Sequence, residues 1–287
     1  MTNQTNHLRK ALRLTCLALL VPGALISATE GTTDDEKKPG GETSQAADQL
    51  EPERPVTPPF ATAVTATEIL FPGLTIDRKT HEIRMDATVC LDGGILEYLV
   101  CLTGTFEHES IFVTEVKPEI LHAALLLTGL EPTPMIPELE HLWWSKALEA
   151  EKSRVGIDVE WESDGYVKRV NVVTMIRKNF GDPKEMFVHG TPPPENSQLD
   201  EDADAWVFSG SFIRALENGE YIYETNRSGV VIGIWRNPSA VIQYGIKTEN
   251  PYRGKNQGMA VNESSVPKEG TPVELIIYKY DPLESTF

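Results

Sequence analysis

The fold is decided by residues 93–130, whose sequence is GGILEYLVCLTGTFEHESIFVTEVKPEILHAALLLTGL. This stretch joins two apolar strand patterns to the triplet His108-Glu109-Ser110 and to a short apolar segment that carries His122. Ionisable groups, a tight turn and a strongly predicted helix fall together only here. If the chain has a functional site, we therefore expect it in this stretch.

The second part of this stretch predicts a helix over residues 118–128. Pro118 suits the first turn, where its missing N–H costs nothing, and Glu119 beside it complements the helix dipole. Gly129 follows the last helical residue, as is typical of a helix end. A second helix is expected over residues 137–154, where apolar residues recur at helical spacing.

Most of the remaining signals are those of strands. Apolar and polar residues alternate in short runs bounded by turn residues, and Asp164-Gly165 is typical of a hairpin turn. We therefore expect an α+β fold, in which a β-dominated, largely antiparallel sheet is covered by a few helices.

The beginning of the chain predicts export. Residues 1–28 contain three basic residues and no acidic one, followed by an apolar run that ends in Ser27-Ala28. This order is typical of a secretory signal peptide, and the run is too short to span a bilayer. Residues 29–60 are rich in Pro, Gly, Thr and charge, which predicts a disordered acidic tether. Residues 61–287 then form the folded domain, with a β-rich C-terminal half. No integral membrane segment is expected in the mature chain.

The charge of the chain limits its partners. The net charge is −17, and loss of the three basic residues in residues 1–28 would make it −20. An acidic surface of this size repels phosphate backbones, which argues against nucleic acid as a partner. A cationic partner, a divalent ion or a neutral polymer remains compatible.

The cysteines restrict the possible cofactors. Without Cys16 in the predicted signal peptide, only Cys90 and Cys101 remain. Two cysteines cannot hold a four-thiolate iron–sulfur cluster. A simple hairpin at residues 92–94 would place Cys90 near Leu96 rather than Cys101, so a disulfide needs curled or shifted strands. A bridge and two buried thiols are both open at this point.

Four parts of the chain resemble the YdjY-domain proteins of bacterial envelopes. Leu96-Glu97-Tyr98 is similar to the beginning of a strand in that family, and Glu107-His108-Glu109-Ser110 to its His-Glu-Ser triplet. Residues 121–129 are similar to the helix that follows. Residues 206–211, with short matches near 237–240 and 270–273, are similar to the C-terminal half of longer members. The resemblance covers residues 65–281 and implies an envelope protein, but no established activity.

The candidate site residues are those that a strand and the following helix could bring together: Glu97, His108, Glu109, Ser110 and His122. On a strand, His108 and Ser110 would face one side. If the helix packs on that strand, His122 would join them. His108 and His122 with a carboxylate would suit zinc or a similar divalent metal, or an acid–base pair. The alternative is that each histidine is a hydrogen-bonded structural residue.

Two functions follow from these patterns. The first is a non-catalytic, exported binding domain whose partner is an envelope protein, a polymer or a small ligand. The second is a metal-binding protein or metal-dependent enzyme centred on His108, Glu109 and His122. The chain contains no Gly-rich phosphate loop, nucleophile elbow or dinucleotide fingerprint.

Overall fold

The computed structural model describes six parts of the chain: residues 60–136, 140–147, 149–178, 206–248, 250–252 and 258–281. These parts belong to one unit, Arg54–Phe287. The predicted signal peptide and all but the last residue of the predicted tether lie outside the described residues.

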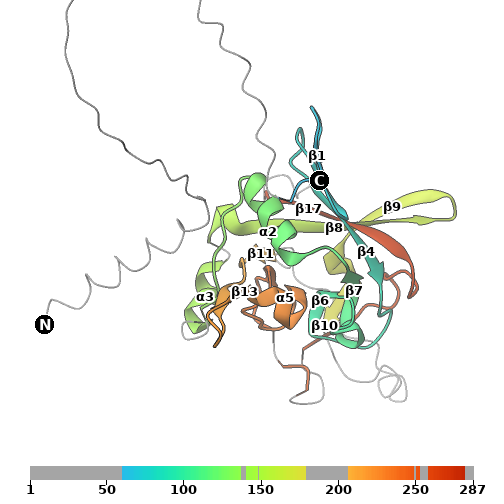
Figure 1. Cartoon of the computed structure of the whole chain (residues 1–287). Helices are drawn as coiled ribbons and strands as arrows, with labels where there is room; N and C mark the ends of the chain where they lie inside the picture. Colours follow the sequence, from blue (N-terminus) through green and yellow to red (C-terminus); the bar gives the residue numbers. More distant parts are fainter. Residues whose placement is uncertain are drawn as a thin grey trace, which may run out of the picture. The chain divides into compact units, whose positions relative to one another are not determined.

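Eight strands pair side by side in a ring, so that the sheet closes into a barrel (Figure 1). In ring order they are β4 (Ile83–Val89), β17 (Pro272–Lys279), β8 (Arg154–Ser163), β11 (Trp206–Phe208), β15 (Ile242–Tyr244), β14 (Val230–Gly233), β6 (Tyr98–Leu102) and β7 (Ser110–Thr114). The ring closes where β7 pairs with β4, through Thr88 with Val113 and Val89 with Phe112. On its other edge, β7 runs parallel to β6.

The closed ring corrects the predicted fold class. The α+β prediction with a largely antiparallel open sheet is wrong, because the described chain is mainly β and its main sheet is a closed barrel. Two pairs in the ring, β6 with β7 and β14 with β15, are parallel. Alternating apolar residues mark a strand with a buried face, but the pattern is the same in an open sheet and in a barrel.

The remaining strands extend or flank the barrel. Four belong to the main sheet: β1 (Ala63–Val64), β2 (Glu68–Phe71), β3 (Leu74–Asp77) and β9 (Tyr166–Asn171). Three form a small sheet: β5 (Ile95–Leu96), β10 (Ile176–Lys178) and β16 (Met259–Val261). Two form a hairpin: β12 (Ile213–Ala215) and β13 (Tyr221–Tyr223). The β8–β9 hairpin reaches beyond the barrel wall (Figure 1).

The described α-helices are α2 (Pro118–Leu127), α3 (Glu140–Ala147) and α5 (Glu224–Ser228). The predicted helix over residues 118–128 is thus confirmed by α2, which ends before Gly129 as expected. Of the second predicted helix, over residues 137–154, α3 is realised, residues 151–153 form a 3₁₀ turn and Arg154 begins β8. Residues 137–139 and 148 of that range lie outside the described residues.

The core follows from the strand period of two. In β4, Ile83, Met85, Ala87 and Val89 are all buried, and the residues between them are more exposed. Large side chains from opposite parts of the ring, among them Phe112 and Trp206, are completely buried in the same apolar cluster. Burial of this apolar surface is the main source of the barrel's stability.

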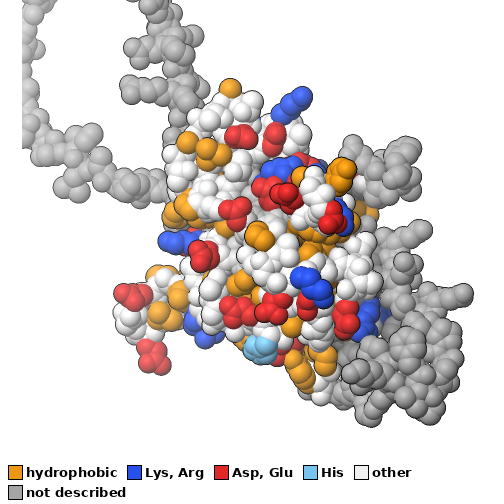
Figure 2. Space-filling view, turned by 90° about the vertical axis from the view of Figure 1, so that its right-hand side faces the viewer, with side chains coloured by type: hydrophobic (Ala, Val, Ile, Leu, Met, Phe, Trp, Pro, Cys, Tyr) orange, Lys and Arg blue, Asp and Glu red, His pale blue; other side chains and the backbone are white. Residues whose placement is uncertain are grey.

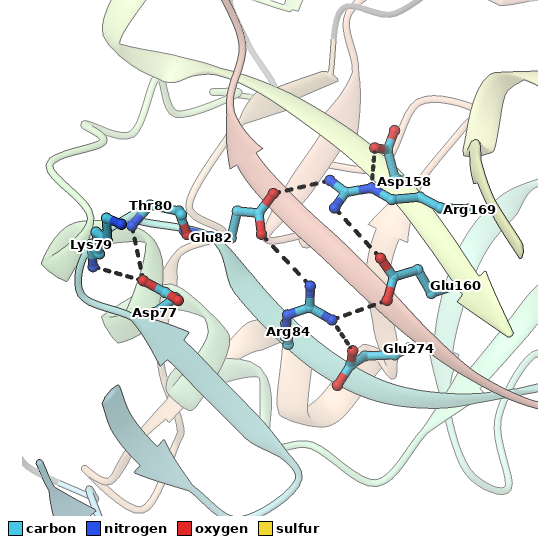
Figure 3. Close-up of polar contacts among 9 residues, drawn as sticks. All are labelled: Asp77, Lys79, Thr80, Glu82, Arg84, Asp158, Glu160, Arg169 and Glu274. Atoms are coloured by element: carbon cyan, nitrogen blue, oxygen red, sulfur yellow. Dashed lines mark hydrogen bonds and ion pairs between the residues drawn. The ribbon is translucent and has the colours of Figure 1, made fainter. Parts of the chain in front are cut away.

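Ion pairs cross the strands on one part of the barrel wall (Figure 3). The Arg84 guanidinium lies 3.0 Å from Glu160 and 2.5 Å from Glu274. Arg169 on β9 lies 2.8 Å from Asp158 and 3.0 Å from Glu82. These contacts join β4, β17, β8 and β9, so they fix the β8–β9 hairpin to its neighbours.

Acidic side chains are spread over the face shown in Figure 2, as the net charge leads one to expect. Within the described ranges, no helix is both long enough and apolar enough to cross a membrane.

Candidate functional site

The predicted triplet lies at one end of β7. Residues Glu107–Glu109 form a 3₁₀ turn, and Ser110 is the first residue of the strand. The expectation that His108 lies on a strand and faces the same side as Ser110 is therefore not met. The Glu97 N–H donates to the Glu109 carbonyl at 3.1 Å, which places the predicted Glu97 beside the turn.

Glu97 is the buried acid of this group. Its residue is 8% exposed, and its backbone carbonyl accepts hydrogen bonds from Ile234 and Trp235. Burial raises the pKa of the Glu97 carboxyl, and the charge of Glu109 raises it further, while Tyr98 and His108 oppose the shift. The charge of Glu109 therefore disfavours ionisation of the buried Glu97 carboxyl.

Glu109 is connected to a distant loop. The Tyr252 hydroxyl donates to a Glu109 carboxylate oxygen at 2.6 Å, and the same oxygen lies 3.4 Å from His108 Nε2. Tyr252 and the His108 side chain are largely exposed, whereas the Glu109 side chain is mostly buried. Burial and then Glu109 raise the pKa of the Tyr252 phenol, so this phenol remains a hydrogen-bond donor.

Tyr98 completes the group. It is 7% exposed and its ring packs on Phe106, with the ring centres 5.0 Å apart. Burial and the contact with Glu97 raise the pKa of its phenol. We call the five residues Glu97, Tyr98, His108, Glu109 and Tyr252 the triplet rim.

Ser110 does not contribute a free hydroxyl to the rim. It is completely buried and its hydroxyl donates to the Phe106 carbonyl at 2.8 Å. Ser110 therefore stabilises the 3₁₀ turn that carries His108 and Glu109.

The structure does not bring His122 to the triplet. His108 precedes β7, whereas His122 lies in α2, which begins after the other end of that strand. His122 contacts Phe208 of β11 and Tyr223 of β13, with ring centres 5.0 and 5.7 Å away. The predicted convergence of His108, Ser110 and His122 is not realised.

Hydrogen bonds determine which nitrogen of His122 carries the proton. The Gly210 carbonyl can only accept, so the Tyr223 hydroxyl donates to it at 3.0 Å. The Tyr223 oxygen then accepts from His122 Nδ1 at 2.9 Å, which places the proton of the neutral imidazole on Nδ1. Burial lowers the pKa of His122, and the Gly210 carbonyl partly offsets this effect. His122 thus joins α2 to the barrel as a neutral, hydrogen-bonded side chain.

The metal hypothesis requires that His108, His122 and a carboxylate bind the same metal ion. Within the described parts of the chain, no group of three or more His, Cys, Asp or Glu side chains is arranged to hold a metal ion. His108 and His122 have no contact in common, so the geometry does not favour a metal centre that joins them.

Sequence reasoning missed the tyrosines. Tyr98 follows Glu97 directly, so its proximity was open to inference. Tyr252 lies 143 residues from its partner Glu109 and has no signal at the level of the sequence. Tyr223 reaches His122 only because the β12–β13 hairpin lies beside α2.

A family model described as the YdjY domain matches residues 74–278, which is well over half of the 287 residues. The matched range includes the whole triplet rim and the His122 contacts. No curated protein sequence and no solved structure matches the chain.

Proposed function

Because the chain belongs to the YdjY-domain family, we propose that it is an exported envelope protein whose barrel is a binding domain rather than an enzyme. The triplet rim is the binding surface, and its ligand is a cationic group of another envelope protein. One observation carries this proposal: three separate segments bring two carboxyl groups and two phenols together around an exposed histidine.

The chemistry of the rim favours a cation. The ionised Glu97 carboxylate costs free energy because it is buried and faces Glu109. The positive charge of an ammonium or guanidinium group in the rim would offset both costs. The Glu97 carboxylate would then stay ionised without taking up a proton. The exposed Tyr252 ring adds a surface that attracts cations. The strong negative charge of the whole chain speeds the approach of such a partner.

Calorimetric titration of the full chain with tri-lysine tests the binding surface. The rim variant is Glu97→Gln with Glu109→Gln. The control, Glu115→Gln with Glu162→Gln, removes the same charge at exposed positions. We expect the control to bind like the wild type and the rim variant to bind at least about tenfold more weakly, which corresponds to about 1.4 kcal/mol. Equal loss in both variants would show that only the overall charge matters and would refute the proposed surface.

Export has its own test. Expression of the full chain in a bacterial host, followed by fractionation and N-terminal sequencing, should give a mature protein that begins at Thr29 outside the cytoplasm. A cytoplasmic protein that keeps residues 1–28 would contradict export without affecting the test of the rim.

A further inference from the structure

Strand β9 leaves one of its two edges unpaired. In the part of the chain that the structure describes, β9 pairs only with β8, from Ser163 with Tyr166 at the turn to Asp158 with Asn171. The β8–β9 hairpin also reaches beyond the barrel wall, and residues 166–169 are all exposed (Figure 1). An exposed strand edge of this kind is a template on which a further strand can pair.

The turn of the hairpin determines which backbone groups of β9 point outward. Both residues of the Asp164-Gly165 turn have positive φ, 56° and 77°, as in a type I′ turn. The flanking residues Ser163 and Tyr166 then exchange both of their hydrogen bonds, and bonded and non-bonded pairs alternate from there. The N–H and C=O groups of Val167 and Arg169 therefore point away from β8. No other described segment bonds to these groups.

The side chains along this edge are apolar and basic. Tyr166 is 76% exposed and Val167 is 72% exposed, so most of each side chain is free to contact a partner. Among the described residues, Lys168 has no ion pair, whereas Arg169 is bound to carboxylates of the barrel wall (Figure 3). Lys168 is thus the cation of this edge that a partner can neutralise.

Lys168 also lies on a different face of the hairpin from the acidic residues of β8. Its cross-strand partner is Trp161, and alternation places the side chains of Asp158 and Glu160 on the other face, with Arg169. An acidic residue directly opposite Lys168 would therefore meet the ammonium group without a carboxylate of β8 beside it.

We propose that β9 is a docking edge for an extended segment of another protein, which joins the sheet as an antiparallel strand. Its backbone pairs with the outward groups of Val167 and Arg169. It carries an acidic residue opposite Lys168 and apolar residues opposite Val167 and Tyr166, because cross-strand pairs of opposite charge and of apolar side chains stabilise a sheet.

A second copy of this chain does not fit the same edge. Two antiparallel β9 strands that use both outward residues must pair Val167 with Arg169 of the other copy. This register places the two Lys168 side chains directly opposite each other, where like charges are destabilising. The net charge of −17 on each copy adds to the repulsion. Lys168 therefore disfavours self-pairing and favours an acidic strand.

NMR titration of the full chain with the peptide acetyl-Thr-Val-Glu-Val-Tyr-Thr-amide tests the docking edge. In the proposed register its Glu lies opposite Lys168, and its two Val residues pair with Val167 and Arg169. We expect amide shifts centred on Val167 and Arg169. The same peptide with both Val nitrogens methylated keeps its charge but cannot donate to β9, so it should bind at least about tenfold more weakly.

Val167→Pro tests the edge from the protein side. It removes an outward N–H and no hydrogen bond to β8, a position at which a strand tolerates proline. Val167→Ala is the matched control, because it removes the side chain and keeps the N–H. We expect the Pro variant to bind the peptide at least about threefold more weakly than the Ala variant. Nuclear Overhauser contacts between Trp161 and Lys168 show whether the hairpin is intact, and the methylated peptide gives the answer if it is not.

Three results would overturn the proposal: equal binding of the two peptides, shifts centred elsewhere, or no binding at millimolar peptide. A dimer of the unliganded chain that Lys168→Glu abolishes or strengthens would assign the edge to a second copy and overturn it as well. The rim variant, Glu97→Gln with Glu109→Gln, should bind the peptide like the wild type. Failure at the docking edge would therefore leave the proposed function unaffected, and the reverse also holds.

Discussion

At the scale of single residues, His122 shows how surroundings determine the role of an ionisable group. The sequence made it a candidate ligand because it lies near the triplet in the chain. In the structure its Nδ1 donates to Tyr223, and its ring packs edge-on against Phe208. These contacts hold a neutral imidazole between α2 and the barrel, which is a structural role.

The lowered pKa of His122 predicts acid sensitivity. Below the ordinary histidine pKa of about 6.5, the unfolded chain takes up a proton before the folded chain does, so acid favours unfolding. This contribution to stability is present above that pH and is lost as the pH falls. We expect His122→Asn, which keeps a donor for Tyr223, to lose less unfolding free energy than the wild type between about pH 7 and pH 5.

Urea unfolding at the two pH values measures this difference. His81→Asn is the control, because His81 is exposed and its φ of 60° is one that asparagine tolerates. The control should keep the pH dependence of the wild type. If His122→Asn also keeps it, burial of His122 does not contribute to acid sensitivity.

At the scale of elements, two glycines end helices with the same backbone conformation but in different surroundings. Gly129 follows α2 with a φ of 85°, and a side chain there would meet open space. Gly229 follows α5 with a φ of 78°, but a Cβ atom there would lie 2.5 Å from the Thr105 side chain. Gly229 therefore allows α5 to approach the loop after β6.

These glycines predict unequal costs. Gly129→Ala should lower the free energy of unfolding by about 1 kcal/mol, the cost of a left-handed residue. Gly229→Ala should cost about 1–3 kcal/mol more, because crowding adds to the same backbone strain. Urea denaturation of both variants checks the difference. Equal losses would mean that Thr105 yields freely and that the approach of α5 is not tight.

The ion pairs on the barrel wall give a second prediction for elements. Arg84 joins β4 to Glu160 of β8 and Glu274 of β17, and its side chain is only one-third exposed. We expect Arg84→Met to cost about 1 kcal/mol at low salt, and less as salt screens the remaining carboxylates.

Lys152→Met is the matched control for Arg84→Met. Its pair with Glu131 is mostly exposed on both sides, so its loss should have almost no effect. Chemical denaturation at two salt concentrations distinguishes the variants. A cost for Arg84→Met that does not change with salt would assign its role to packing rather than charge.

At the scale of the whole molecule, local sequence patterns predicted the individual helices and strands better than the way in which the strands pair. The ends of α2 follow from Pro118 and Gly129, because these residues act within one turn of the chain. Pairing of β7 with both β4 and β6 depends on contacts between distant strands, which alternating residues do not encode. The open-sheet prediction failed for that reason.

For the candidate site too, contacts between nearby segments were predictable from the sequence, whereas contacts between distant segments were not. Glu97, His108 and Glu109 do lie together, because they belong to neighbouring segments joined directly to β7. His122 is carried away by α2, and Tyr252 arrives from a loop far along the chain. The sequence left open whether Cys90 and Cys101 form a disulfide, and in the structure both are free thiols.

Closure of the barrel by β7 positions the triplet rim, because the turn that carries His108 and Glu109 leads directly into this strand. The most direct test is nuclear Overhauser contacts across both edges of β7 in solution. We predict contacts of Thr88 with Val113 and Val89 with Phe112 on the β4 side, and of Tyr98 with Ser110 on the β6 side. Contacts on only one of these two edges would show an open sheet and contradict the account.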